Sequence, residues 1–198
     1  MDRQLHRRAL LLSYFTVCYN VIEGILSLFA GSLVDSIALI GFGLDSFVES
    51  LSGIIVIWRF TLHGKVSDEE EEEAERKAAR FIGYTFFMLA AYVLYESAKK
   101  IYLQEIPGPS LFGIILAIIS LVAMPVLFYL KYRLGKAIGS RSLVADSKET
   151  LACSFLSLAL LVGLGLNYLF GIWQADPIIG LIIAGFLIRE GKETLEGE

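Results

Sequence analysis

Charged residues, cysteines and histidines are all scarce in this sequence, and each shortage excludes a class of protein. Charged residues make up 19% of the 198 positions, whereas a soluble globular domain is close to a quarter charged. The two cysteines, Cys18 and Cys153, fall within apolar segments, so a structural disulfide is not expected. The two histidines, His6 and His63, lie outside those segments, so no Ser-His or Cys-His catalytic pair is expected inside them. No basic patch with interleaved aromatic residues indicates binding to nucleic acid.

Long apolar stretches, separated by clusters of charge, are what the sequence does contain. Hydrophobic residues make up 56% of the chain, and the mean hydropathy is +0.64. An apolar run of about 20 residues is the length that a membrane-spanning helix needs. We therefore predict an all-α, polytopic membrane protein that forms a single transmembrane domain. Its six spans are expected at about 9–30, 34–58, 80–102, 110–130, 143–169 and 174–189. Asp176 followed by Pro177 predicts the N-cap and first position of the sixth helix.

Lysine and arginine are distributed unevenly between the two sets of connections. One set carries most of them: Arg3, Arg7, Arg8, Arg59, Lys65, Arg76, Lys77, Arg80, Lys131, Arg133, Lys136, Arg141, Arg189 and Lys192. The other set carries only Lys99 and Lys100. Because positively charged connections stay in the cytoplasm, we predict that the N and C termini are both cytoplasmic. The expected location is a bacterial inner membrane.

The segment 67–73 is a serine followed by Asp68 and five glutamates. One interpretation is the start of a helix, since Ser67 and Glu70 have the spacing of a capping box and acidic residues favour the positive end of a helix. The other is a loop, 68–73, that collects cations before they enter the protein. The sequence leaves both interpretations open.

Two pairs of polar residues stand inside predicted spans. Asp45 and Glu49 are spaced i, i+4 in the second span, and Glu149 and Cys153 have the same spacing in the fifth. Each pair therefore lies on one face of its helix. An ionised group at mid-span costs about 2.5–3.5 kcal/mol, so these groups are expected to meet one another, a cation or water.

Four such ligands from two neighbouring helices suit a tetrahedral divalent metal ion. Carboxylates with a thiolate are compatible with zinc, and the thiolate favours softer ions such as cadmium. Asp146 lies three residues before Glu149, on about the same face, and is a further candidate ligand. The alternatives are that Cys153 is a small buried hydrophobic residue, and that the carboxylates form a polar bridge between helices.

Asn20 and Glu23 are i, i+3 neighbours in the first span. Three accessory roles stay open for them: a hydrogen bond to a metal ligand, an access path, or a proton relay.

An enzyme is a third possibility. The segment 41–45 resembles the glycine-aspartate motif of intramembrane aspartyl proteases. In that motif the aspartate directly follows the second glycine, whereas Asp45 comes one residue late, and no second matching motif is present. We therefore expect no enzymatic activity.

Residues 36–49, 143–153 and 175–180 together resemble segments of one known family of metal transporters, the cation diffusion facilitator (cation efflux) family. Residues 36–49 resemble the second span of that family, in which a His or Asp and an Asp four residues later bind metal; Asp45 and Glu49 occupy those positions. Residues 143–153 are similar to the beginning of the fifth span, and residues 175–180 to that of the sixth. Two features depart from the family. Glu149 and Cys153 replace its usual His or Asp and Asp, and the sequence is expected to be a membrane-only member without the soluble C-terminal domain.

The resemblance implies a secondary transporter that exports a divalent metal cation from the cytoplasm by proton antiport. Zinc is the favoured cargo, with cadmium, manganese, cobalt and iron(II) as alternatives, and no cofactor is expected. The expected partners are the metal ion, protons, the lipid bilayer and a second copy of the chain, bound through the transmembrane helices. The competing hypothesis is a non-transporting metal sensor or membrane assembly subunit that uses the same ligands.

Overall fold

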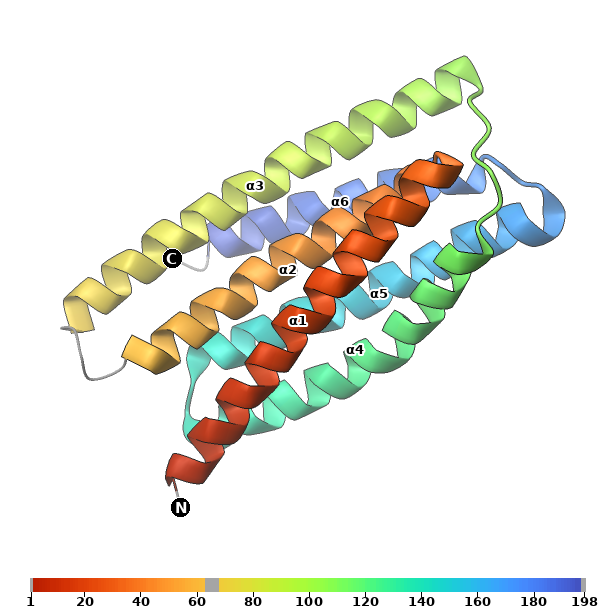
Figure 1. Cartoon of the computed structure of the whole chain (residues 1–198). Coiled ribbons are helices and arrows are strands. Elements are labelled where there is room, and N and C mark those ends of the chain that lie inside the picture. The colour runs from red at the N-terminus through yellow and green to blue at the C-terminus, as the bar shows by residue number, and fades with distance from the viewer. Residues whose placement is uncertain (1, 63–67, 197–198) are drawn as a thin grey trace.

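The structure, a computed structural model, describes residues 2–62 and 68–196, which form six α-helices joined by short connections. Successive helices run in opposite directions, so both termini lie at the same end of the bundle (Figure 1). We call it the terminal end, and the opposite end the far end. The helices are α1 (Asp2–Val34), α2 (Ile37–Leu62), α3 (Asp68–Leu103), α4 (Leu111–Ile138), α5 (Arg141–Phe170) and α6 (Ala175–Glu196). The predicted all-α fold is confirmed, with a helix at each of the six expected places.

The helices pack mainly as three antiparallel pairs: α1 with α2, α4 with α5, and α3 with α6. Beyond its partner α1, α2 also contacts α3, α5 and α6, which places it centrally in the bundle. The α1–α2 pair is especially close, because a Cβ added to Gly43 would lie 3.0 Å from the carbonyl oxygen of Gly24. Small residues at such points let the backbones of membrane helices approach each other. The apolar core between the helices includes Leu39, Phe42, Val93, Met124, Leu160, Ile183 and Leu187.

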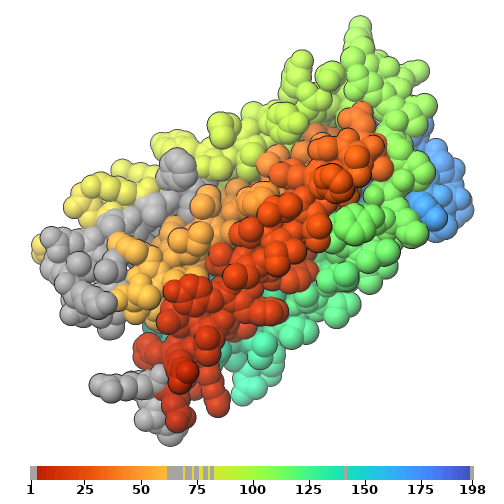
Figure 2. Space-filling model, viewed as in Figure 1, coloured from red at the N-terminus to blue at the C-terminus, as the bar shows by residue number. Residues whose placement is uncertain are grey.

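Four of the described helices contain segments long and apolar enough to cross a membrane: Gln4–Val34, Ile37–Thr61, Leu111–Ile138 and Ser142–Phe170. α1 lies across the face shown in Figure 2, between α3 and α4. Many of its outward side chains are large and apolar, and they include Phe15, Ile22, Phe29 and Leu33. A broad apolar outer surface is suited to contact with lipid rather than water. The protein is an integral membrane protein.

The acidic segment forms the first turns of α3, since that helix begins at Asp68. This placement agrees with the interpretation of 68–73 as a helix start. Ser67, the other member of the expected capping box, lies outside the described residues. Glu73, the last residue of this acidic segment, forms an exposed ion pair with Lys77 at 2.8 Å.

Asp176 does not have the position that the sequence predicts. α6 begins one residue earlier, at Ala175, so the prediction of Asp176 as the N-cap of α6 is wrong. The buried Asp176 carboxylate instead accepts hydrogen bonds from the backbone N–H of Ile37, at 3.0 Å, and from the Ser36 hydroxyl. It therefore satisfies free N–H groups at the start of α2, and it joins α6 to α2 at the far end.

Candidate metal site

The two predicted ligands on α2 are both buried inside the bundle. Asp45 and Glu49 are 7% and 5% exposed. They lie one helical turn apart on the same side of α2, so both face the neighbouring helix α5, with which α2 is in contact. Aspartate and glutamate side chains are otherwise mostly exposed to water, so the apolar core of the bundle is what buries these two.

The α5 ligands meet those of α2 because the two helices run in opposite directions. Asp45 lies closer to the far end than Glu49, and Cys153 lies closer to it than Glu149. This order brings Cys153 level with Asp45, and the Cys153 thiol is close enough for polar interactions with both Asp45 and Glu49. Cys153 is buried, whereas Glu149 is half-buried and interacts with Ser52. The identical i, i+4 spacing on antiparallel helices thus brings the four side chains together.

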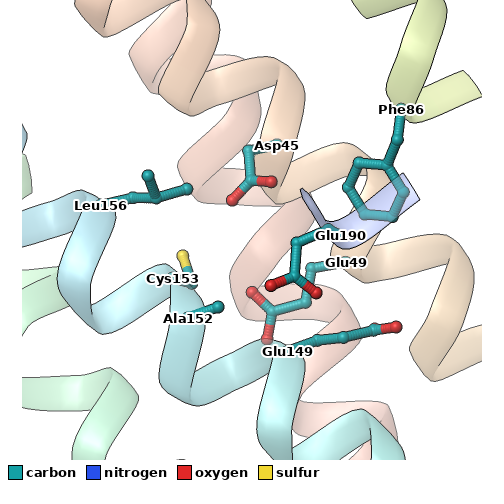
Figure 3. Close-up of a pocket in the computed structure, with 8 residues that line it drawn as sticks. All are labelled: Asp45, Glu49, Phe86, Glu149, Ala152, Cys153, Leu156 and Glu190. Atoms are coloured by element: carbon teal, nitrogen blue, oxygen red, sulfur yellow. The ribbon is translucent and has the colours of Figure 1, made fainter. Parts of the chain in front are cut away.

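One pocket contains all four of these side chains (Figure 3). Asp45 from α2 and Cys153 from α5 point into the same space, whereas the Glu149 side chain extends away from them. Phe86 of α3 and Glu190 of α6 complete the wall, together with Ala152 and Leu156. The pocket therefore draws on α2, α3, α5 and α6.

The donors are gathered, but they do not form a finished coordination sphere. Across residues 2–62 and 68–196, no three His, Cys, Asp or Glu side chains are placed so that they could hold a metal ion. One oxygen of Glu49 and one of Glu149 have no hydrogen-bond partner in this described part of the chain. Of the described residues that line the pocket, four are acidic and none is basic. Unpartnered acidic oxygens in a largely buried pocket are what a cation would satisfy.

Glu190 was not singled out by the sequence analysis. It follows the apolar part of the sixth predicted span and looks like part of a solvated end. Yet Ile183 and Leu187 are fully buried on α6, and the helical spacing of that buried face continues to Glu190. This periodicity is the signal that could have identified it.

Asp146 is placed differently from the other candidate ligands. It is fully buried, but it does not line the pocket. Its carboxylate lies 2.8 Å from the ammonium group of Lys131, which is itself fully buried on α4. Sequence reasoning assigned Lys131 to a charged connection. The buried face of α4 includes Ser120, Met124 and Leu127, and its spacing continues to Lys131.

The two accessory candidates on α1 also lie outside the pocket lining. Glu23 is buried, and its two oxygens accept hydrogen bonds from the Tyr19 hydroxyl and the Ser46 hydroxyl, each at 3.0 Å. Ser46 is adjacent to Asp45, so Glu23 is linked to the helix segment that carries the site. Asn20 is fully buried, and its amide nitrogen and oxygen have no partner within the described residues.

Comparisons with known proteins identify the group to which this arrangement belongs. The model of the cation efflux transmembrane domain matches residues 13–195. Transmembrane protein 163 of Xenopus laevis is 22% identical over 96% of the chain, and an uncharacterized transporter of Methanocaldococcus jannaschii is 27% identical over 83%. Magnetosome protein MamB of Magnetospira is 21% identical over 93% of the chain. The chain spans 66%, 59% and 64% of the lengths of these three relatives. Because the family model covers nearly the whole sequence, the chain belongs to the cation efflux family.

Proposed function

We propose that this protein is a secondary transporter that exports a divalent metal cation, with zinc as its principal cargo. The observation that carries the proposal is the meeting of Asp45, Glu49, Glu149 and Cys153 in one acidic pocket between two antiparallel helices. Membership of the cation efflux family and similarity to a protein named as a transporter support the same conclusion.

The donor set favours zinc over larger or harder ions. Three carboxylates and one thiolate supply four ligands of types that zinc accepts in tetrahedral sites. The thiolate of Cys153 also makes cadmium a good substrate, since soft ligands favour soft ions. Manganese, cobalt and iron(II) are the comparison ions, because they share the charge but differ in preferred geometry.

Proton antiport follows from the chemistry of the ligands. A carboxyl or thiol group must lose its proton before it binds metal strongly, so metal binding and proton binding compete at the same atoms. Protons arriving from outside therefore help to release the metal there. The proposal takes all six helices as spans, and the terminal end, where lysine and arginine are concentrated, as cytoplasmic.

Transport by purified protein in vesicles tests the proposal. Zinc uptake under a proton gradient is measured for the wild type, Asp45→Asn and Cys153→Ser. Glu193→Gln is the matched control, because Glu193 is an exposed carboxylate that pairs with Arg189 on α6. We expect zinc uptake by the wild type and the control, with a loss on the order of 100-fold in Asp45→Asn, as when metal coordination is disrupted.

Three outcomes separate the hypotheses. Normal uptake by Asp45→Asn would place the site elsewhere. Binding of zinc without translocation by the wild type would support the metal sensor or membrane assembly subunit instead. Transport of another divalent ion with zinc excluded would keep the transporter and replace its cargo.

A further inference from the structure

A buried chain of polar contacts adjoins the pocket and crosses three helices. The Lys131 ammonium group on α4 lies 2.8 Å from the Asp146 carboxylate and donates a hydrogen bond of 2.8 Å to the Thr150 hydroxyl, both on α5. Asp146 and Thr150 are one turn apart, which allows a single ammonium group to reach both. All three side chains are buried, at 0–1% exposed. Such a charged group in the interior is stable only with partners of this kind.

The Thr150 hydroxyl also contacts Glu49, a predicted metal ligand. Because it accepts a hydrogen bond from Lys131, its single proton is free to be donated elsewhere. The Glu49 carboxylate oxygen Oε1 lies 2.6 Å away on α2, whereas the alternative acceptor, the Asp146 backbone oxygen, lies at 3.1 Å. The charged and closer acceptor makes the stronger hydrogen bond. The Lys131 ammonium group, 3.9 Å from the same Oε1, adds attraction.

The two oxygens of Glu49 therefore differ. Oε1 is engaged by Thr150, while Oε2 has no partner among residues 2–62 and 68–196, and Glu49 lines the pocket. We infer that Thr150, positioned by Lys131, makes Glu49 a one-oxygen ligand and thereby sets which metal the site selects. The inference rests on the proposed function and concerns its specificity.

The selectivity follows from coordination number. Four residues that each contribute one donor atom make a tetrahedral site, the geometry of protein-bound zinc. Manganese prefers octahedral, oxygen-rich sites, and a carboxylate that binds through both oxygens raises the coordination number. By occupying Oε1, Thr150 withholds the additional oxygen. The same ammonium group keeps Asp146 paired, so a second nearby carboxylate is also withheld from the metal.

The substitution Thr150→Val tests this role, because it removes the hydroxyl and leaves the Lys131–Asp146 pair in place. We expect the ratio of manganese to zinc kcat/KM in vesicles to rise on the order of tenfold, mainly through a lower KM for manganese. Thr150→Ser keeps the hydroxyl and is expected to keep the wild-type ratio. An unchanged ratio in Thr150→Val would overturn the inference, as would an equal shift in Thr150→Ser.

A second variant tests the inference independently, in case Thr150→Val does not fold. The double substitution of Lys131→Met and Asp146→Asn removes the ammonium group together with the charge of its closer carboxylate partner, and the same rise in the manganese ratio is expected. If this double variant keeps the wild-type ratio, Lys131 does not position Thr150 and the inference fails.

Equilibrium binding separates this inference from the proposed function. Zinc and manganese are competed on the whole chain in detergent, for the wild type and Thr150→Val. A wild type that binds both ions without moving them overturns transport alone, and a shifted binding ratio in Thr150→Val then still supports the role of Thr150. A wild type that binds neither ion overturns both.

Discussion

Asp146 and the carboxylates of the pocket lie next to each other in this protein, and their charges are balanced in different ways. Asp146 has a cation supplied by the chain itself, the Lys131 ammonium group at 2.8 Å. The pocket beside it holds Asp45, Glu49 and Glu149. None of its described lining residues is basic, and Lys131 reaches it only at 3.9 Å, from one oxygen of Glu49. Under the proposed function, the internal cation completes a permanent structure, whereas the pocket is left for a cation that is bound and released.

The largest effect is expected when the Lys131–Asp146 ion pair is broken. Lys131→Met leaves Asp146 buried without its partner, so we expect the free energy of unfolding in detergent to fall by about 3–5 kcal/mol. The control is Lys136→Met, because Lys136 is an exposed lysine on the same helix. Adding Asp146→Asn to Lys131→Met should recover most of the loss. Unchanged stability in Lys131→Met would show that the pair does not hold the bundle together.

Zinc binding in the pocket should have the next largest effect on the stability of the protein. Zinc at one hundred times its Kd is expected to stabilise the folded wild type by about 2.7 kcal/mol, measured as the shift of the unfolding midpoint. Asp45→Asn should gain far less, because it lacks a ligand, while Glu193→Gln should gain as much as the wild type. Equal stabilisation of all three proteins would mean that zinc binds outside the pocket.

Another buried carboxylate sharpens the contrast, since Glu23 is balanced by hydroxyl groups and has no basic partner in the described part of the chain. Tyr19→Phe removes one of the hydrogen bonds to Glu23 and should lower the free energy of unfolding by about 1 kcal/mol. The selectivity among metals should stay unchanged, because Glu23 does not line the pocket. A change in selectivity would place Glu23 among the residues that control the metal.

The smallest expected effect concerns Glu190, the half-buried acidic residue that α6 adds to the pocket wall. Glu190→Gln removes one negative charge near the metal and should raise the KM for zinc about threefold, as expected of a charge that is partly screened by solvent. Transport assays with Glu193→Gln as the control measure this. A loss as large as that of Asp45→Asn would instead make Glu190 a ligand.

The sequence was most informative where a pattern lies within one helix. Apolar runs located the helices, and the i, i+4 spacing of Asp45 with Glu49 and of Glu149 with Cys153 predicted residues that the fold brings to one pocket. The partners of buried charges on other helices could not be found this way. Lys131 pairs with Asp146 only because α4 packs against α5 in one register. Likewise, Asp176 caps α2 instead of its own helix because α6 packs against α2.

The close approach of α1 and α2 has a mechanical consequence. A Cβ on Gly24 or on Gly43 would come within 3.0 Å of the other residue's carbonyl oxygen, so the two backbones form a fixed contact. Asp45 and Glu49 therefore belong to the closely packed α1–α2 pair, whereas Glu149 and Cys153 belong to the α4–α5 pair. An ion bound by all four side chains would link the α1–α2 pair to the α4–α5 pair, and its release would remove that link. Loading the cargo should then change the rigidity of the bundle as well as its charge.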